Sequence, residues 1–279
     1  MNASALAVRI ILTWISLLAI QVVLGILIPP PAPQPKNVMP WLLLSILLVA
    51  TALGFLATRS DWRGLRLALT ISGIPVVVTL TNYLEGIIFL TSSGIDWPKE
   101  ILRACLLNAL AIPLWLLIFR KPATPQSNYR PFTAKPIGER LWRFALADLA
   151  YPVLYFVAGM IIFPYVRDFY ATQTIPPVGK VFAMQLLVRG PIYVGICLLM
   201  TRMLGLSRLG GAIAVGLAFA TLNGIAPLIV PSGVFPDAVR WAHFYEVAVS
   251  NFAFGAFVAW LWGKPQPTAQ LGSKAATAC

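Results

Sequence analysis

Charged residues are scarce in this chain, and their scarcity excludes a water-soluble fold. Only 11% of the 279 residues are charged, 59% are hydrophobic, and the mean hydropathy is +0.81. A soluble domain carries about 25% charged residues, because water must solvate its surface. Apolar runs of about twenty residues, the length that crosses a bilayer as a helix, recur along the whole chain. The sequence therefore predicts an integral membrane protein.

Histidine and cysteine are also rare, which removes several kinds of chemistry. A haem held by two histidines cannot be built around the single histidine, His243. The three cysteines form no CxxC pair, and no GxSxG sequence surrounds a serine. The sequence therefore predicts no cofactor and no metal, and it assigns no catalytic residue. Whether the protein is an enzyme stays open at this point.

Basic residues exceed acidic ones, giving a net charge of +12. They lie between the apolar runs, where they are explained as positive flanks of membrane helices, so we expect the lipid bilayer as a partner and no nucleic acid. With the N-terminus placed in the cytoplasm, 14 basic residues fall on that side, 6 fall on the other, and Arg189 lies within a span. The positive-inside rule then predicts a multi-pass protein of the cell membrane with both termini in the cytoplasm.

The long apolar segments predict an all-α, polytopic transmembrane bundle of eight spans, because lipid offers no partner to an unpaired backbone group. A β-barrel would need short alternating segments, and these runs are long and continuous. The third segment contains Gly73 and Pro75, so we expect a tilt, a kink or an interruption there. The predicted spans cover residues 8–29, 41–59, 65–91, 100–119, 143–166, 180–201, 208–230 and 238–263.

The spans divide four and four around a basic, proline-containing segment. Residues 91–98 and 230–236 both place a Ser-Gly pair before a proline at the end of the third span of a half. Halves with an even number of spans would be parallel repeats, and chance similarity between apolar, glycine-containing segments is the alternative. We expect transmembrane halves at 1–119 and 143–263, a cytoplasmic linker at 120–142 and a cytoplasmic tail at 264–279.

The last span carries a polar stripe. Arg240, His243, Glu246 and Ser250 are spaced by three, three and four residues, so they share one helical face. On a lipid-immersed helix, such a face must point into the bundle or towards a water-filled cavity. His243 and Glu246 are spaced as a hydrogen-bonded pair, which would either serve proton transfer or ligand binding, or hold an interfacial histidine in place.

Arg189 lies next to Gly190-Pro191 within span six. A guanidinium at that depth needs carboxylates or carbonyls, and we expect Glu85 and Glu246 to be its partners. A structural ion-pair network, an anion-binding site and snorkelling to the interface are the three interpretations. In the predicted orientation, polar residues of four spans share one depth in the outer half of the membrane. The candidate polar cluster comprises Asn82, Glu85, Gln185, Arg189, Asn223, His243 and Glu246.

Three functions are compatible with this pattern. A small-molecule or ion permease is favoured by the polar cluster, by the interruptions at Pro75, Pro191 and Pro227, and by the repeat. A non-catalytic scaffold, sensor or accessory subunit would use the cluster as internal glue. A membrane-embedded enzyme acting on a lipophilic substrate would use His243 and Glu246 for acid–base chemistry. Besides the bilayer, we expect a small-molecule or lipid ligand, and the sequence defines no oligomeric state.

Overall fold

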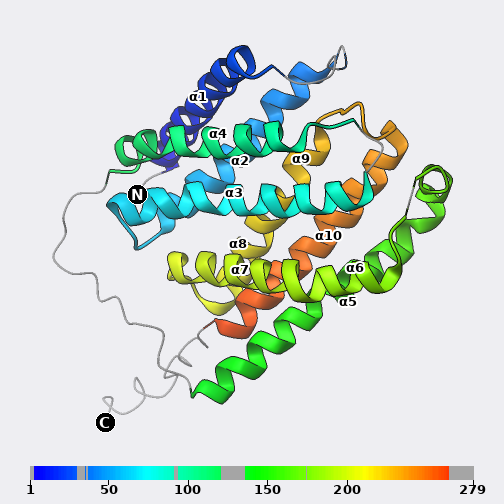
Figure 1. The fold of residues 1–279 in the computed structure, drawn as a ribbon. Helices are drawn as coiled ribbons and strands as arrows, with labels where there is room; N and C mark the ends of the chain where they lie inside the picture. The colour runs from blue at the N-terminus through cyan, green and yellow to red at the C-terminus, as the bar shows by residue number, and fades with distance from the viewer. Residues whose placement is uncertain are drawn as a thin grey trace, which may run out of the picture.

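The protein folds into a bundle of long helices (Figure 1). The structure, a computed structural model, describes residues 3–29, 35, 37–90, 94–120, 136–173 and 175–263. Within these ranges it contains helices and no strand, which confirms the all-α prediction. Among the described residues, eight helices are long and apolar enough to cross a membrane, as a multi-pass membrane protein requires. The predicted tail at 264–279 and residues 121–135 of the predicted linker lie outside the described residues.

The helices of the first half are single segments, whereas two spans of the second half are composite. The first half comprises α1 (Ala3–Leu27), α2 (Val38–Arg59), α3 (Gly64–Phe89) and α4 (Trp97–Ile118). The second half begins with α5 (Ile137–Tyr170), which starts within the segment expected to be a linker. Span six consists of α6 (Val178–Met184), the π-helical turn η1 (Gln185–Arg189) and α7 (Gly190–Leu204). Span seven consists of α8 (Arg208–Ala220), the π-helical turn η2 (Thr221–Ile225) and α9 (Ala226–Ile229). Span eight is the single helix α10 (Asp237–Trp262).

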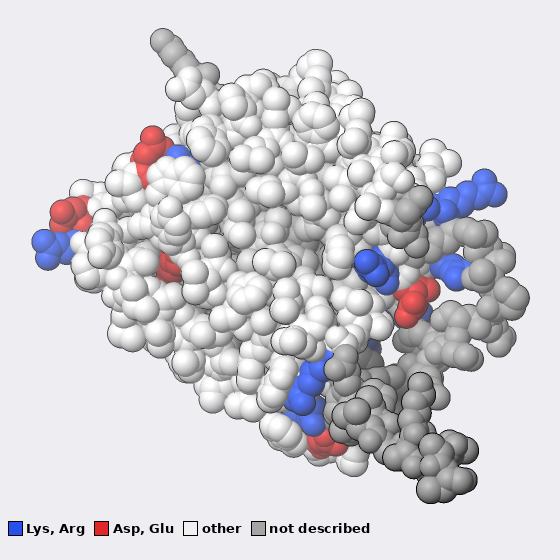
Figure 2. All heavy atoms as spheres, turned by 180° about the vertical axis from the view of Figure 1, so that it is seen from behind, with Lys and Arg blue, Asp and Glu red and all other residues white. Residues whose placement is uncertain are grey.

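The bundle has two distinct ends. Because the number of spans is even, α1 begins and α10 ends on the same side, on the left of Figure 1; we call this the terminal side. The connections α3–α4, α5–α6 and α9–α10 lie on the opposite, distal side. Figure 2 shows a broad surface with very little charge between groups of charged side chains, as contact with lipid requires. The assignment of the terminal side to the cytoplasm stays a prediction.

Each half uses the same helix neighbours. In the first half, α1 packs against α2 and α4, and α3 packs against α4. In the second half, α5 packs against α7 and α10, and α8 packs against α10. Between the halves, α2 and α3 contact α7 and η2. The division into two parallel four-helix repeats stays a prediction. Such repeats would both show this pattern of neighbouring helices.

Glycine residues bring α8 and α10 together. A Cβ on Gly255 would lie 3.1 Å from the Gly216 Cα, and a Cβ on Gly216 would lie 2.8 Å from the Phe252 carbonyl oxygen. Two membrane helices without side chains at their crossing can place their backbones in close van der Waals contact, which is a main source of helix association in lipid. The crossing holds α10, with its polar stripe, against the centre of the bundle.

Candidate functional site

The π-helical turns η1 and η2 place polar residues in the centre of the bundle. Each turn precedes a proline, Pro191 or Pro227, which lacks a backbone N–H and whose ring collides with the carbonyl four residues earlier. For Pro227 that carbonyl belongs to Asn223. It accepts a hydrogen bond from Asn82 Nδ2 at 3.3 Å instead. The interruptions expected at Pro191 and Pro227 are thus π-helical turns, whereas α3 continues through Pro75 as one helix.

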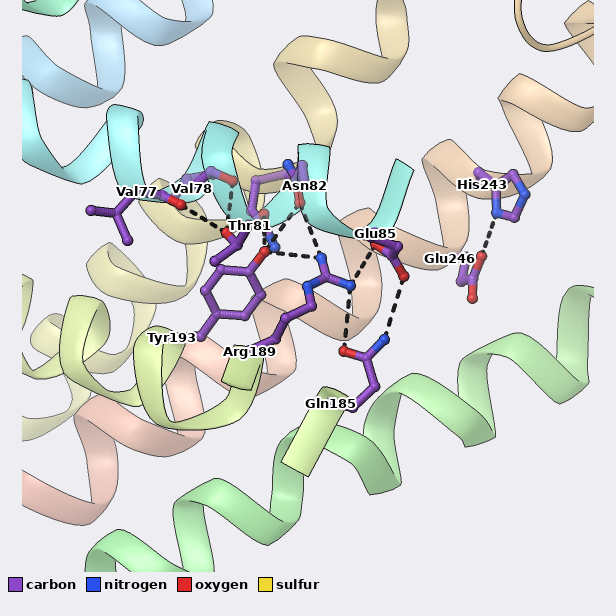
Figure 3. Close-up of polar contacts among 11 residues, drawn as sticks. Val77, Val78, Thr81, Asn82, Glu85, Gln185, Arg189, Tyr193, His243 and Glu246 are labelled. Carbon is purple, nitrogen blue, oxygen red and sulfur yellow. Dashed lines mark hydrogen bonds and ion pairs between the residues drawn. The ribbon is translucent and has the colours of Figure 1, made fainter. Parts of the chain in front are cut away.

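Arg189 is the centre of a buried hydrogen-bond network (Figure 3). Its Nη1 lies 2.5 Å from Glu85 Oε2, and its Nη2 donates to Asn82 Oδ1 at 3.0 Å and to the Tyr193 hydroxyl at 2.9 Å. Gln185 accepts a hydrogen bond from Nη1 and donates one to Glu85. The Arg189 side chain is only 4% exposed. Arg189 therefore does not snorkel to the interface, and both Nη atoms already have partners within the chain.

Tyr193 completes this network, although it is absent from the sequence-predicted cluster. Its hydroxyl lies 3.1 Å from Asn82 Oδ1 and 3.0 Å from Asn223 Oδ1, and it has one proton to donate to one of them. Tyr193 follows Arg189 by four residues, so both side chains lie on the same face of span six. This spacing is the sequence signal that could have placed Tyr193 in the cluster.

Four aromatic rings close the bundle next to the network, one turn nearer the terminal side. Tyr151, Tyr193, Phe219 and Phe254 come from α5, α7, α8 and α10. Their rings form a closed cycle with neighbouring centroids 5.0 to 5.7 Å apart. The most exposed of the four, Tyr151, has only 5% of its surface exposed. We call this cycle the aromatic layer; it packs against the polar network through Tyr193, which belongs to both.

His243 and Glu246 form a second polar group on α10, beside the Arg189 network (Figure 3). His243 Nδ1 lies 2.7 Å from Glu246 Oε2, and Nε2 lies 2.9 Å from the Tyr170 hydroxyl. One neutral tautomer satisfies both contacts, because Tyr170 then donates to Nε2 while Nδ1–H donates to the carboxylate. The expectation that Glu246 also pairs with Arg189 is wrong, since Glu85 takes that place and Glu246 bonds to its neighbour on α10.

The two polar groups line a partly open cavity of about 260 Å³ between α3, α5, α10 and the π-helical turns. This volume is near the lower end of the range for small-molecule sites, about 300–1,000 Å³. Gln185 is fully buried and belongs to the site only through its hydrogen bonds. The other predicted cluster residues line the cavity directly, together with residues that were not predicted, among them Phe89, Tyr151, Tyr155, Tyr170, Phe235 and Asn251.

Arg240 belongs to the polar stripe of α10 but not to the cavity. Its Nη1 donates to the Leu228 and Ile229 carbonyls at 3.0 Å each, and its Nη2 pairs with Asp237 at 2.9 Å. The last carbonyls of a helix have no partner within it, and a basic side chain can satisfy them. The stripe thus has a structural part, which caps α9, and a part that faces the cavity.

The cavity is lined by aromatic rings, amides, hydroxyls, two carboxylates, the Arg189 guanidinium and the His243 imidazole. In the part of the chain that the structure describes, no group of three or more His, Cys, Asp or Glu side chains converges as a metal site would require. A comparison of the chain with protein-family models, with curated proteins and with solved structures finds no match.

Proposed function

We propose that this membrane protein binds a small molecule in the cavity, and the arrangement of the cavity carries the proposal. A space of about 260 Å³ lies within a bundle of apolar helices. Polar side chains inside a membrane are unfavourable unless they serve the structure or a ligand. The cavity wall combines many aromatic and aliphatic side chains with a few polar groups, which is typical of small-molecule sites.

The three predicted functions differ in how well they explain the two polar groups. A purely structural role, as in a scaffold, explains the Arg189 network, because both Nη atoms bond within the chain. It does not explain why His243 and Glu246 line a space. A permease and an enzyme with a lipophilic substrate both begin by binding a ligand in such a space. Ligand binding is therefore the function that the site supports best.

The aromatic layer beside the cavity favours a permease as the second candidate. Tyr151 of the aromatic layer lines the cavity, and residues of the π-helical turns lie directly beside this layer. Such turns are frequent at functional sites, and transporters often interrupt helices at their substrate sites. Separation of the aromatic layer would open the cavity towards the terminal side, which is the second state that alternating access needs.

Ser250 and Val249 offer a matched pair of positions for testing ligand binding. Ser250 lines the cavity, whereas the neighbouring Val249 is 69% exposed and points away from it. We expect a thermal-unfolding screen of small cations, anions and neutral compounds to find ligands that raise the midpoint of the purified wild type by about 2 °C or more. The same ligands should stabilise Val249→Phe but not Ser250→Phe. A screen in which no compound distinguishes these two variants would overturn the proposal.

A further inference from the structure

We infer that the ligand is a lipophilic organic cation, an amine or quaternary ammonium with an apolar body, and that its charged group lies against Glu246. This inference rests on the proposed function and adds the charge and the shape of the ligand. Three observations carry it: the different partners of the two carboxylates at the cavity, the free oxygen of Glu246, and an apolar groove that begins at this carboxylate.

The two carboxylates that line the cavity, Glu85 and Glu246, have different partners. Glu85 is compensated by Arg189 at 2.5 Å, and the Nη atoms of Arg189 have no place for a second carboxylate. Arg240 is bound to Asp237 and to the end of α9. Glu246 is bonded instead to His243, whose neutral tautomer satisfies both this contact and the one with Tyr170. A carboxylate at membrane depth needs a cationic partner, and a bound cation would supply it.

The second oxygen of Glu246 is directed away from His243. His243 bonds to Oε2, whereas Oε1 faces α5, where a Cβ on Gly159 would lie 3.5 Å from it. Because Gly159 has no side chain, space is kept between α5 and the carboxylate. This space belongs to a second cavity of about 250 Å³, which is lined mainly by apolar residues of α5, such as Phe156 and Met160.

The two cavities meet at the carboxylate. Both are lined by Phe89, Tyr155, Tyr170, His243 and Glu246. The face of an aromatic ring attracts a cation within about 6 Å, so the three aromatic side chains of this set favour the same charge as Glu246 does. A ligand with a cationic head and an apolar tail fits the arrangement: the head lies between the carboxylate and the rings, and the tail lies in the groove along α5.

Decyltrimethylammonium is a probe of this chemistry, and 1-decanol and decyl sulfate have the same chain with a neutral and an anionic head. We expect equilibrium dialysis of the full chain in maltoside micelles, with protein-free micelles as background, to show saturable binding of about one decyltrimethylammonium per chain. Glu246→Gln should weaken this binding about tenfold or more, because it removes the ionic partner. Asp168→Asn is the matched control, since Asp168 is a 95% exposed carboxylate on the same side of the bundle.

Gly159→Leu provides a second variant, which fills the groove and leaves the charge of Glu246 unchanged. It should weaken binding of the cation as well, and it carries the test alone if Glu246→Gln does not fold. Lysophosphatidylcholine, which has the same trimethylammonium head, distinguishes two sources of the ligand. Its competition would identify a choline-headed lipid, and its failure to compete would identify a free amphiphilic cation.

Three outcomes would overturn the inference. Equal binding of 1-decanol or decyl sulfate would mean that charge does not select the ligand. Binding of the cation that is unchanged in Glu246→Gln or in Gly159→Leu would place it elsewhere. Either result leaves the proposed binding function intact. Saturable binding by none of the probes would overturn the inference as well, and the thermal-unfolding screen would then decide whether the cavity binds another class of compound.

Discussion

At the scale of single residues, the polar cluster consists of two groups with different physical roles. The guanidinium of Arg189 is surrounded by acceptors from α3 and from span six, and its charge is matched by Glu85. His243 and Glu246 have one hydrogen bond between them and leave a carboxylate oxygen beside a cavity. A charge inside a membrane must be compensated, and an arginine does this for Glu85, whereas the partner of Glu246 is a histidine.

Replacement of Arg189 should strongly destabilise the fold. Removal of one partner from a buried ion pair costs about 3–5 kcal/mol, and the 25% exposure of the Glu85 side chain lowers the expected loss to about 2–3 kcal/mol. We expect this loss for Arg189→Met in reversible unfolding of the purified protein in micelles. The double variant Arg189→Met/Glu85→Met, which leaves no unpaired charge, should recover much of it.

Arg167→Met is the matched control for this experiment. Arg167 pairs with Asp168 at 3.3 Å, but the two side chains are 68% and 95% exposed. Exposed pairs contribute little, so this variant should change the stability by no more than about 0.5 kcal/mol. If Arg189→Met were as stable as Arg167→Met, the network around Arg189 would not be what joins α3 to spans six and seven.

At the scale of secondary-structure elements, proline and glycine act together at the π-helical turns. Pro191 and Pro227 each follow a π-helical turn, and a glycine stands in or directly after that turn. A Cβ on Gly190 would overlap the carboxylate of Asp148 on α5, and a Cβ on Gly224 would overlap Val247 on α10. The prolines disturb the helical hydrogen bonds, and the glycines allow the neighbouring helices to approach at the same level.

Gly190→Ala should therefore destabilise the protein, and Gly195→Ala on the same helix should not. A methyl group at Gly190 would meet Asp148 and would lie 2.9 Å from the Gln185 carbonyl oxygen, whereas nothing lies within 4 Å of a Cβ at Gly195. Overpacking of this kind costs about 1–3 kcal/mol. Thermal unfolding of the two variants under identical conditions measures the difference.

A second-site substitution identifies the origin of the loss. Asp148→Ala combined with Gly190→Ala removes the side chain that the methyl group meets but leaves the Gln185 carbonyl in place. Part of the lost stability should then return. Equal midpoints for Gly190→Ala and Gly195→Ala would contradict the close approach of α5 to span six.

At the scale of the whole molecule, the cavity lies towards the distal side of the bundle, next to the aromatic layer. The cavity is lined by the distal end of α3, by residues of α5 between Tyr151 and Tyr170 and by residues of α10 between His243 and Asn251. Of the aromatic layer, Tyr151 lines the cavity, and Tyr193, Phe219 and Phe254 pack with it away from the cavity. A cavity that lies towards the distal side is suited to binding from that side, and transport would require a second state that opens towards the terminal side.

Single cysteines in a cysteine-free variant can measure both the orientation and this asymmetry. Gly138 lies on the terminal side, Thr172 on the distal side, and Ser250 in the cavity. In the predicted orientation, a membrane-impermeant maleimide added to intact cells should label Thr172→Cys and should not label Gly138→Cys. Ser250→Cys should react with a small impermeant thiol reagent from the Thr172 side.

The pattern of labelling separates the alternatives. Labelling of Gly138→Cys in intact cells, with Thr172→Cys protected, would reverse the predicted orientation. Labelling of both from one side would contradict an odd number of crossings between them. Reaction of Ser250→Cys from both sides would support a permease, and reaction from the Thr172 side alone would favour a binding protein without transport.

The sequence by itself determined the all-α membrane-spanning class and the number of spans, and it indicated seven polar residues that meet at or beside the cavity. These follow from local patterns: a run of apolar residues is long enough to cross lipid or it is not, and His243 and Glu246 share a face because they are three residues apart on one helix. The prolines at 191 and 227 also indicated local interruptions, because their effect on the helix is local.

Only the tertiary structure decided which polar residues are partners. Glu85 and Arg189 lie on different helices, so no spacing along the chain could show that Glu85 rather than Glu246 reaches the guanidinium. The same holds for Tyr193, for the aromatic layer and for the two cavities that meet at Glu246, because each is formed by side chains from several helices. Pairing in a bundle depends on how helices cross and rotate, and close packing at residues such as Gly216 and Gly255 sets that geometry.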